Sequence, residues 1–130
     1  MASDWTVLAT ASTIEGVGQA SAEMLIEAGC EIRLPETFQA HPTAALQPLL
    51  TGVQGIYAGL DDFSADVLAS DEATKLQIIS RWGVGYDSID VAAATELGIV
   101  ITYTPGLLDE AVADYTFALL LGVARRIHTG

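Results

Sequence analysis

The chain has 130 residues, about the length of one domain, so two complete domains are excluded. Its 51% hydrophobic and 17% charged residues are typical of a globular protein that buries a core, and not of a disordered chain. The formal net charge of −12, from 17 acidic and 5 basic side chains, leaves no basic surface for nucleic acid or anionic membranes. We therefore expect neither as a partner.

The cysteine content and the first residues bear on the cellular compartment. Cys30 is the single cysteine, so no disulfide can form within the chain. Residues 1–4 lack the charged and apolar regions of a secretory signal. We expect a reducing, cytoplasmic compartment, and we predict no metal site.

Short apolar runs alternate with helical patterns along most of the chain. Strands are predicted at residues 6–10, 30–34, 53–58, 76–82 and 99–103, and helices at 20–28, 43–50, 64–70 and 91–97. Gly29 and Gly98 end the helices at 20–28 and 91–97, Ser64 and Asp90 cap those at 64–70 and 91–97, and Pro48 weakens the prediction at 43–50. This alternation predicts an α/β fold with a doubly wound, five-stranded parallel sheet, whose ligand crevice lies beyond the carboxyl ends of the strands.

The last segment departs from this pattern. A helix is predicted from about residue 108, with Asp109 and Glu110 early and Arg125 and Arg126 late, the charge order that the helix dipole favours. Between them, residues 115–124 are apolar on nearly every face, which requires burial on every side. The run is too short to span a bilayer. We interpret it as a docking helix whose partner is a second copy or polypeptide outside this chain; the alternative is a central helix of the same domain.

Two Gly-x-Gly pairs invite a dinucleotide interpretation, at residues 16–18 and 83–85. Both have serine, Ser21 and Ser88, at the sixth position of the pattern, where glycine or alanine is needed for close helix packing. Neither pair is a Rossmann fingerprint, and we interpret the first as a flexible loop. The second leaves a predicted strand end, where its backbone N–H groups either bind a small anion such as a carboxylate or form a plain tight turn.

Four ordered segments make the second half of the chain recognisable: residues 81–90 (RWGVGYDSID), 93–100 (AATELGIV), 104–106 (TPG) and 110–114 (EAVAD). They resemble the amino-terminal part of the D-2-hydroxyacid dehydrogenases, particularly the 3-phosphoglycerate dehydrogenase branch. The resemblance implies a flavodoxin-like substrate-binding domain at 1–103, followed by a hinge at Thr104 and Pro105. Residues 104–130 would then hold the hinge and the first helix of an NAD-binding domain, which packs across the family's homodimer interface.

The resemblance also implies site residues. Ala58, Gly59 and Leu60, together with Val84 and Gly85, would contact a small 2-hydroxy or 2-oxo acid, chiefly through backbone groups. The remaining assignments lie on the last helix: Val112 as a weak cofactor contact, and the docking residues Phe117, Leu119, Leu120 and Leu121.

No catalytic residue can be assigned from the resemblance. The family transfers a hydride between a 2-hydroxy acid and the nicotinamide of NAD, but its cofactor loop, arginine and histidine correspond to positions after residue 130. We expect this chain alone to be inactive and to bind no NAD. His41 and His128 are expected to be solvent-exposed and not catalytic.

Several positions depart from the family pattern. Members acting on phosphoglycerate often have Arg-Ser where this chain has Ala58 and Gly59, so that substrate is not indicated. Tyr103 and Ser88 stand where asparagine is common.

Two hypotheses of a different functional class are alternatives to a dehydrogenase. In a flavodoxin-like FMN electron carrier, the hydroxyls of residues 10–13 would hold the flavin phosphate and Trp82, Tyr86 or Tyr57 would stack on the ring, although Glu15 would oppose the phosphate. In a self-associating module without chemistry, the chain would form a homodimer, with its last helix exchanged between protomers. A phosphorylation receiver is disfavoured, because the first predicted strand ends without the paired acids that hold magnesium. Asp61 and Asp62 follow the third strand alone and are interpreted as a solvated pair.

Overall fold

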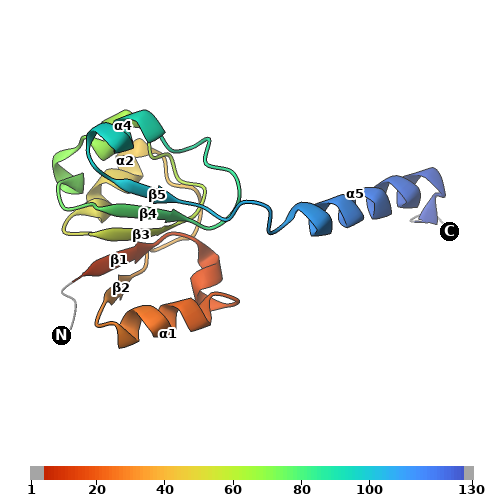
Figure 1. The fold of residues 1–130 in the computed structure, drawn as a ribbon, viewed down its shortest axis with the longest axis horizontal. Helices are drawn as coiled ribbons and strands as arrows, with labels where there is room; N and C mark the ends of the chain where they lie inside the picture. The colour runs from red at the N-terminus through yellow and green to blue at the C-terminus, as the bar shows by residue number, and fades with distance from the viewer. Residues whose placement is uncertain (1–4, 128–130) are drawn as a thin grey trace.

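The computed structural model describes residues 5–127, so His128 lies outside the described residues. Figure 1 shows a sheet with helices on both sides and one long helix apart from it. The elements in chain order are β1 (Thr6–Ala9), the 3₁₀ helix η1 (Ser12–Glu15), α1 (Gln19–Glu27), β2 (Glu31–Arg33), α2 (Thr43–Leu46), η2 (Gln47–Leu50), β3 (Gly55–Ala58), α3 (Ala65–Leu68), η3 (Asp71–Ala73), β4 (Ile78–Arg81), α4 (Val91–Glu96), β5 (Val100–Thr102) and α5 (Asp109–Ala124).

The strands form one parallel sheet in the order β2-β1-β3-β4-β5. This is the flavodoxin-like doubly wound order, so the predicted fold class is confirmed. The predicted helix at 43–50 divides into α2 and η2, with Pro48 in the first turn of η2. Proline has no N–H to continue the α-helical hydrogen bonds, which explains the division.

The core lies between the sheet and the helices α2, α3 and α4. Leu8, Ile56 and Ile79, from three adjacent strands, point to this side and are at most 2% exposed. Because side chains alternate along a strand, their neighbours in sequence point to the opposite face, which α1 flanks (Figure 1).

The predicted helix ends are found with one difference. Asp90 Oδ1 accepts a hydrogen bond from the Ala93 N–H at 2.9 Å, which confirms it as the cap of α4. Ser64 occupies the N-cap position of α3 but makes no capping hydrogen bond with its side chain. Gly29 and Gly98 follow α1 and α4 with φ values of 85° and 73°, which suit glycine.

Helix α5 extends away from the sheet, and none of its residues is buried (Figure 1). The alternative of a central helix of the same domain is therefore wrong. Its apolar side chains are exposed, including the predicted docking residues Phe117, Leu119, Leu120 and Leu121, which are 53 to 64% accessible. Within residues 5–127, no helix combines the length and the apolar character needed to cross a bilayer.

Candidate functional site

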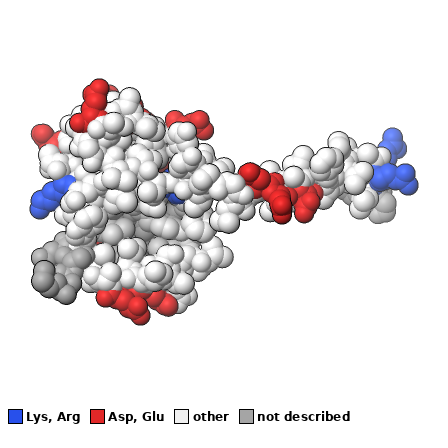
Figure 2. All heavy atoms as spheres, viewed as in Figure 1, with Lys and Arg blue, Asp and Glu red and all other residues white. Residues whose placement is uncertain are grey.

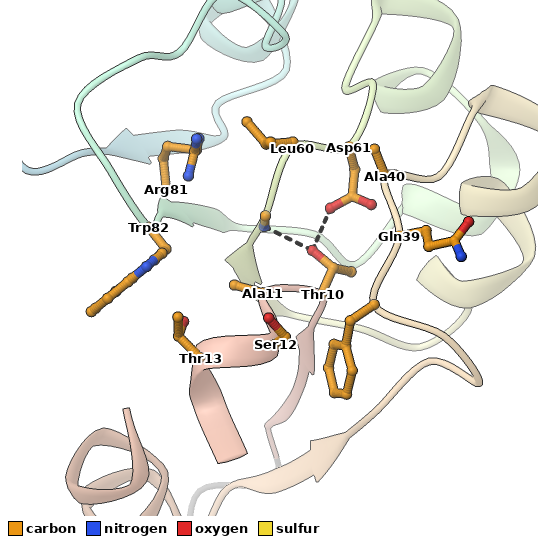
Figure 3. A pocket seen from close by; sticks show the side chains of 12 residues that line it. Thr10, Ala11, Ser12, Thr13, Gln39, Ala40, Leu60, Asp61, Arg81 and Trp82 are labelled. Atoms are coloured by element: carbon orange, nitrogen blue, oxygen red, sulfur yellow. Dashed lines mark hydrogen bonds between the residues drawn. The ribbon is translucent and has the colours of Figure 1, made fainter. Parts of the chain in front are cut away.

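A cavity of about 260 Å³ lies at the carboxyl edge of the sheet, where β1 and β3 adjoin. The chain leaves these two strands in opposite directions across the sheet, and such switch points are where open α/β sheets bind ligands. The cavity walls come from the loops after β1, β3 and β4 and from the loop after β2 (Figure 3); the lining residues are Thr10, Ala11, Ser12, Thr13, Phe38, Gln39, Ala40, Gly59, Leu60, Asp61, Arg81 and Trp82.

A buried carboxylate holds three of these loops together. Asp61 is 1% exposed, and its Oδ2 accepts a short hydrogen bond from the Thr10 hydroxyl. Its Oδ1 accepts from the His41 backbone N–H at 3.0 Å and contacts His41 Nδ1 at 2.6 Å. A buried carboxylate costs several kcal/mol unless such partners satisfy it, so these contacts fix the loops relative to one another.

His41 and Asp61 therefore correct two expectations. The His41 side chain is 11% exposed and not solvent-exposed, because Asp61 holds its ring by Nδ1. Asp61 is buried and does not form a solvated pair with Asp62. Asp62 is exposed and accepts a hydrogen bond from Thr43 Oγ1. In sequence His41 is 20 residues from Asp61, so no local pattern links them.

Gly59 lies where the loops after β1 and β3 contact each other. Its N–H donates to Thr10 Oγ1 at 2.9 Å (Figure 3). A Cβ at this position would be 3.1 Å from the Thr10 carbonyl oxygen, so a side chain fits only if the backbone moves. The Gly59 amide is thus occupied within the fold, which leaves its neighbour Leu60, 70% exposed at the cavity, as the accessible part of this loop.

Arg81 brings a positive charge to the cavity. It ends β4, and its Nε is buried without a hydrogen-bond partner. Within residues 5–127 it has no ion-pair partner, although the chain carries 17 acidic residues. An orphaned buried donor costs about 1–3 kcal/mol, so Arg81 is a charge at the cavity that the described side chains leave uncompensated.

Two aromatic pairs join the loop after β4 to neighbouring segments. The rings of Tyr57 and Trp82 lie 5.7 Å apart between centroids, and those of Tyr86 and Tyr103 lie 5.0 Å apart. The second pair joins the loop after β4 to the residue that follows β5. All three rings that could stack on a flavin are therefore engaged with one another or with Tyr103.

The predicted residues Val84 and Gly85 lie in the loop after β4, outside the cavity lining. The predicted hinge adjoins this loop, because the Thr104 N–H donates to the Gly83 carbonyl at 3.0 Å, one residue before Pro105. The loop after β4 and the hinge are thus mechanically connected.

The other predicted site residues are separated from the cavity. The Ala58 side chain is fully buried in the core, and its carbonyl accepts from the Trp82 N–H. Val112 lies on α5, where it is 59% exposed, away from the cavity (Figure 1). Of the predicted substrate contacts, the cavity brings together only Gly59 and Leu60.

Four residues of this site were not predicted in these roles: His41, Asp61, Arg81 and Thr10, the last of which was considered only as a ligand of a flavin phosphate. The one available signal was at Arg81, a rare base in an acidic chain placed at the predicted end of a strand. The other three depend on contacts between residues 20 to 51 positions apart.

The first Gly-x-Gly pair does not leave a strand end. Gly16 and Gly18 follow η1 and not a strand, and a Cβ on Gly18 would be 2.7 Å from the Thr13 carbonyl oxygen and 3.0 Å from the Tyr57 hydroxyl. This close packing excludes the approach of a pyrophosphate to the glycine. No group of three or more His, Cys, Asp or Glu side chains in residues 5–127 could hold a metal ion.

Solved structures share this fold. The TT0316 protein from Thermus thermophilus matches with a TM-score of 0.78 and 36% identity, over 94% of this chain and 37% of that one. An NAD⁺-bound 3-phosphoglycerate dehydrogenase from Entamoeba histolytica matches with a TM-score of 0.77 and 22% identity, over 92% of this chain and 39% of that one.

Sequence comparison gives the same relationship. The glyoxylate reductase of Thermococcus litoralis is 43% identical over 103 residues, which are 79% of this chain and 31% of that protein. The glyoxylate reductase of Aeropyrum pernix is 38% identical over 75% of this chain and 29% of its own. The chain thus spans about a third of the length of these relatives. The family model of the D-isomer specific 2-hydroxyacid dehydrogenase catalytic domain matches residues 8–125, and the chain belongs to that family.

Proposed function

We propose that this chain is the substrate-binding part of an NAD-dependent D-2-hydroxyacid dehydrogenase acting on a small 2-oxo or 2-hydroxy acid. Residues 1–103 form the substrate-binding domain in this proposal. Residues 104–130 form the hinge, at Thr104 and Pro105, and the first helix of an NAD-binding domain. The single cysteine, which cannot form a disulfide within the chain, supports a cytoplasmic location.

The observation that carries the proposal is the uncompensated Arg81 in the cavity at the switch point. A 2-oxo acid has a carboxylate that accepts charge-assisted hydrogen bonds, which are about twice as strong as neutral ones. Arg81, which lines the cavity and has no ion-pair partner in residues 5–127, is the cationic group proposed to bind this carboxylate. Leu60, at the same cavity, would cover the small apolar part of the substrate.

Hydride transfer itself is not assigned to any described residue. The described glycines form no pyrophosphate turn, and the His41 Nδ1 is engaged by Asp61. We therefore expect the chain alone to be catalytically inactive and to bind no NAD. Val112 stays a candidate for a cofactor contact in the whole protein.

Titration with oxalate tests the anion site. Oxalate is an unreactive analogue of glyoxylate that keeps its carboxylate. We expect chemical-shift changes at the amides of residues 59–60 and 81–85 in the NMR spectrum of the chain. Arg81→Met should weaken binding at least tenfold, whereas Arg125→Met, at the far end of α5, should leave it unchanged. Equal binding by the two variants would contradict the proposed site.

We also propose that the chain forms a homodimer through α5. The helix exposes Phe117, Leu119, Leu120 and Leu121, and each large apolar side chain left in water forfeits about 1.5–3 kcal/mol. Contiguous exposed apolar surface of this kind is typical of an interface. Light scattering at increasing concentration should report twice the chain mass.

The contacts around residues 10–13 do not favour a flavin carrier. A flavin phosphate held by residues 10–13 would lie beside Asp61, whose carboxylate is bonded to the Thr10 hydroxyl that the phosphate would need. Trp82 and Tyr57 contact each other, and Tyr86 contacts Tyr103, so no ring is left unpaired for the flavin.

A further inference from the structure

The cavity at the carboxyl edge is larger than a two-carbon acid needs. Its volume of about 260 Å³ is roughly the share of eight or nine water molecules in the liquid, at about 30 Å³ each. Glyoxylate and oxalate have only two carbon atoms, so either one held at Arg81 would leave part of this space unfilled. Because a well-formed pocket covers most of its ligand, the surplus volume bears on which 2-oxo acid fits.

The unfilled part of the cavity lies away from Arg81. In Figure 3, Arg81 lies on one side of the cavity, and Gln39 and Ala40 lie on the other. Residues 38–40 belong to the loop after β2, whereas Arg81 ends β4, and β1 and β3 separate these two strands in the sheet. A ligand whose carboxylate is held by Arg81 would therefore extend its side chain toward residues 38–40.

The walls along this path are partly apolar. Phe38, next to Gln39 in the loop after β2, lines the cavity and is half-buried. Leu60, which Figure 3 shows between the two sides, is 70% exposed. Ala11 and Ala40 add only methyl groups to the lining, so they leave room for a ligand. An apolar ligand side chain that covers Phe38 and Leu60 removes apolar surface from water, which favours binding.

The charges of the cavity suit one negative charge and not two. In the described part of the chain, Arg81 is the one basic residue of the cavity lining, and Arg33 at the end of β2 donates to backbone carbonyls in residues 49–51 instead. On the side away from Arg81 the lining includes Asp61, which does not form an ion pair with Arg81. A second negative charge at this end would face a carboxylate, which disfavours its binding.

We infer that the cavity selects monocarboxylic 2-oxo acids with an uncharged apolar side chain, and that Phe38 is a residue that determines this specificity. The inference rests on the proposed function, since it requires the ligand carboxylate at Arg81, and it adds which 2-oxo acids the site takes. Dicarboxylic and phosphorylated 2-oxo acids are disfavoured by the carboxylate of Asp61. Glyoxylate fits but fills only the Arg81 end.

Three 2-oxo acids test this selection when each is titrated into the chain without NAD and followed by NMR. Pyruvate has a methyl side chain, 4-methyl-2-oxopentanoate has a branched apolar one, and 2-oxoglutarate has a charged one. We expect 4-methyl-2-oxopentanoate to shift the amides of residues 38–40 as well as those of 81–85. It should bind about tenfold more tightly than pyruvate, since one methylene group in an apolar pocket is worth about tenfold or more. 2-Oxoglutarate should bind at least tenfold more weakly than 4-methyl-2-oxopentanoate.

A matched pair of phenylalanines tests the role of Phe38. Phe38→Ala should weaken the binding of 4-methyl-2-oxopentanoate at least fivefold and leave that of pyruvate within twofold, because pyruvate does not reach this wall. Phe117→Ala, on the exposed helix α5, should change neither affinity. A merely structural role of Phe38 would instead weaken both ligands alike.

A charge substitution tests the role of the cavity charges. Gln39→Lys places a cation on the side away from Arg81, and we expect it to raise the affinity for 2-oxoglutarate about tenfold without improving that for 4-methyl-2-oxopentanoate. Gln77→Lys is the control, because it makes the same change in net charge at an exposed position before β4, at the opposite edge of the sheet. It should leave both affinities within twofold.

The outcomes separate this inference from the proposed function. Equal affinities for the three 2-oxo acids, with oxalate still bound at Arg81, would overturn the selectivity and leave the proposed site. Chemical-shift changes confined to residues 81–85, or equal losses for both ligands in Phe38→Ala, would overturn the role of Phe38. An absence of binding by every acid, oxalate included, would overturn both the selectivity and the proposed site.

Discussion

The ring of His41 lies with its Nδ1 2.6 Å from Oδ1 of Asp61, and the two residues join the loop after β2 to the loop after β3. A second contact strengthens the connection, since the Asp62 N–H donates to the His41 carbonyl at 3.3 Å. The cavity that holds Arg81 therefore has a wall built by a buried side-chain network and not by secondary structure.

Asp61→Asn should destabilise the fold by about 2–4 kcal/mol. The amide replaces one acceptor oxygen with an NH₂ group, which would face either the His41 or the Thr10 donor. Urea unfolding measures the change. Asp62→Asn is the matched control and should change the free energy of unfolding by less than about 0.5 kcal/mol, because Asp62 is exposed. Equal effects would show that burial of Asp61 does not matter.

Gly18→Ala should cost about 1–3 kcal/mol in the free energy of unfolding. The new methyl group would lie 2.7 Å from the Thr13 carbonyl oxygen, a backbone atom that cannot rotate away. Gly122→Ala on α5 has open space around it and should leave the unfolding of the sheet domain unchanged. Thermal melts followed by circular dichroism compare the two; an unchanged melting temperature in Gly18→Ala would contradict the close packing.

Arg81→Met should leave stability unchanged or raise it by up to about 1 kcal/mol. The substitution removes a buried Nε that has no hydrogen-bond partner and keeps much of the apolar stem. A variant that is at least as stable but no longer binds oxalate is the pattern expected of a binding residue that costs stability. Marked destabilisation in urea would instead indicate a structural role for Arg81.

Removal of α5, by ending the chain at Gly106, should leave a folded monomer. The hydrophobic core extends from Leu8 to Ile99, and no residue of α5 is buried against it. We expect the urea midpoint to change little, and light scattering to report the mass of one chain. An unfolded product would show that α5 stabilises the sheet domain.

NADH fluorescence should show no binding to the chain at micromolar concentrations. Gly18 is packed against Thr13 and Tyr57, and a Cβ on Gly83 would lie 3.1 Å from Arg81 Nη1, so the surroundings of both pairs argue against a pyrophosphate turn. A saturable rise in nicotinamide emission would contradict the proposal that the described residues lack a cofactor site.

Much of the fold could be predicted from local patterns. Local patterns predicted the strands at residues 6–10 and 99–103 and the ends of two helices at glycines. Each of these signals depends only on residues close together in the sequence. The apolar character of residues 115–124 likewise predicted a helix whose apolar faces its own domain does not cover.

The candidate site was only partly predictable. Gly59 and Leu60 came from the family resemblance, and the structure puts both at the cavity. The contacts of Asp61 could not be predicted, because in the sequence a carboxylate flanked by Leu60 and Asp62 resembles any exposed acidic residue of a loop. Its burial depends on Thr10 and His41, which the fold brings in from two other loops.

By itself the sequence determined the order of strands and helices, the acidic charge, the apolar last helix and the family, since each depends on residue type and short spacing. Only the tertiary structure decided that Asp61 is buried against His41, that Arg81 has no partner, and that residues 38–40 line the same cavity as Arg81. The reason is that burial and pairing depend on which distant segments the parallel sheet brings together, and that information lies in no single stretch of the chain.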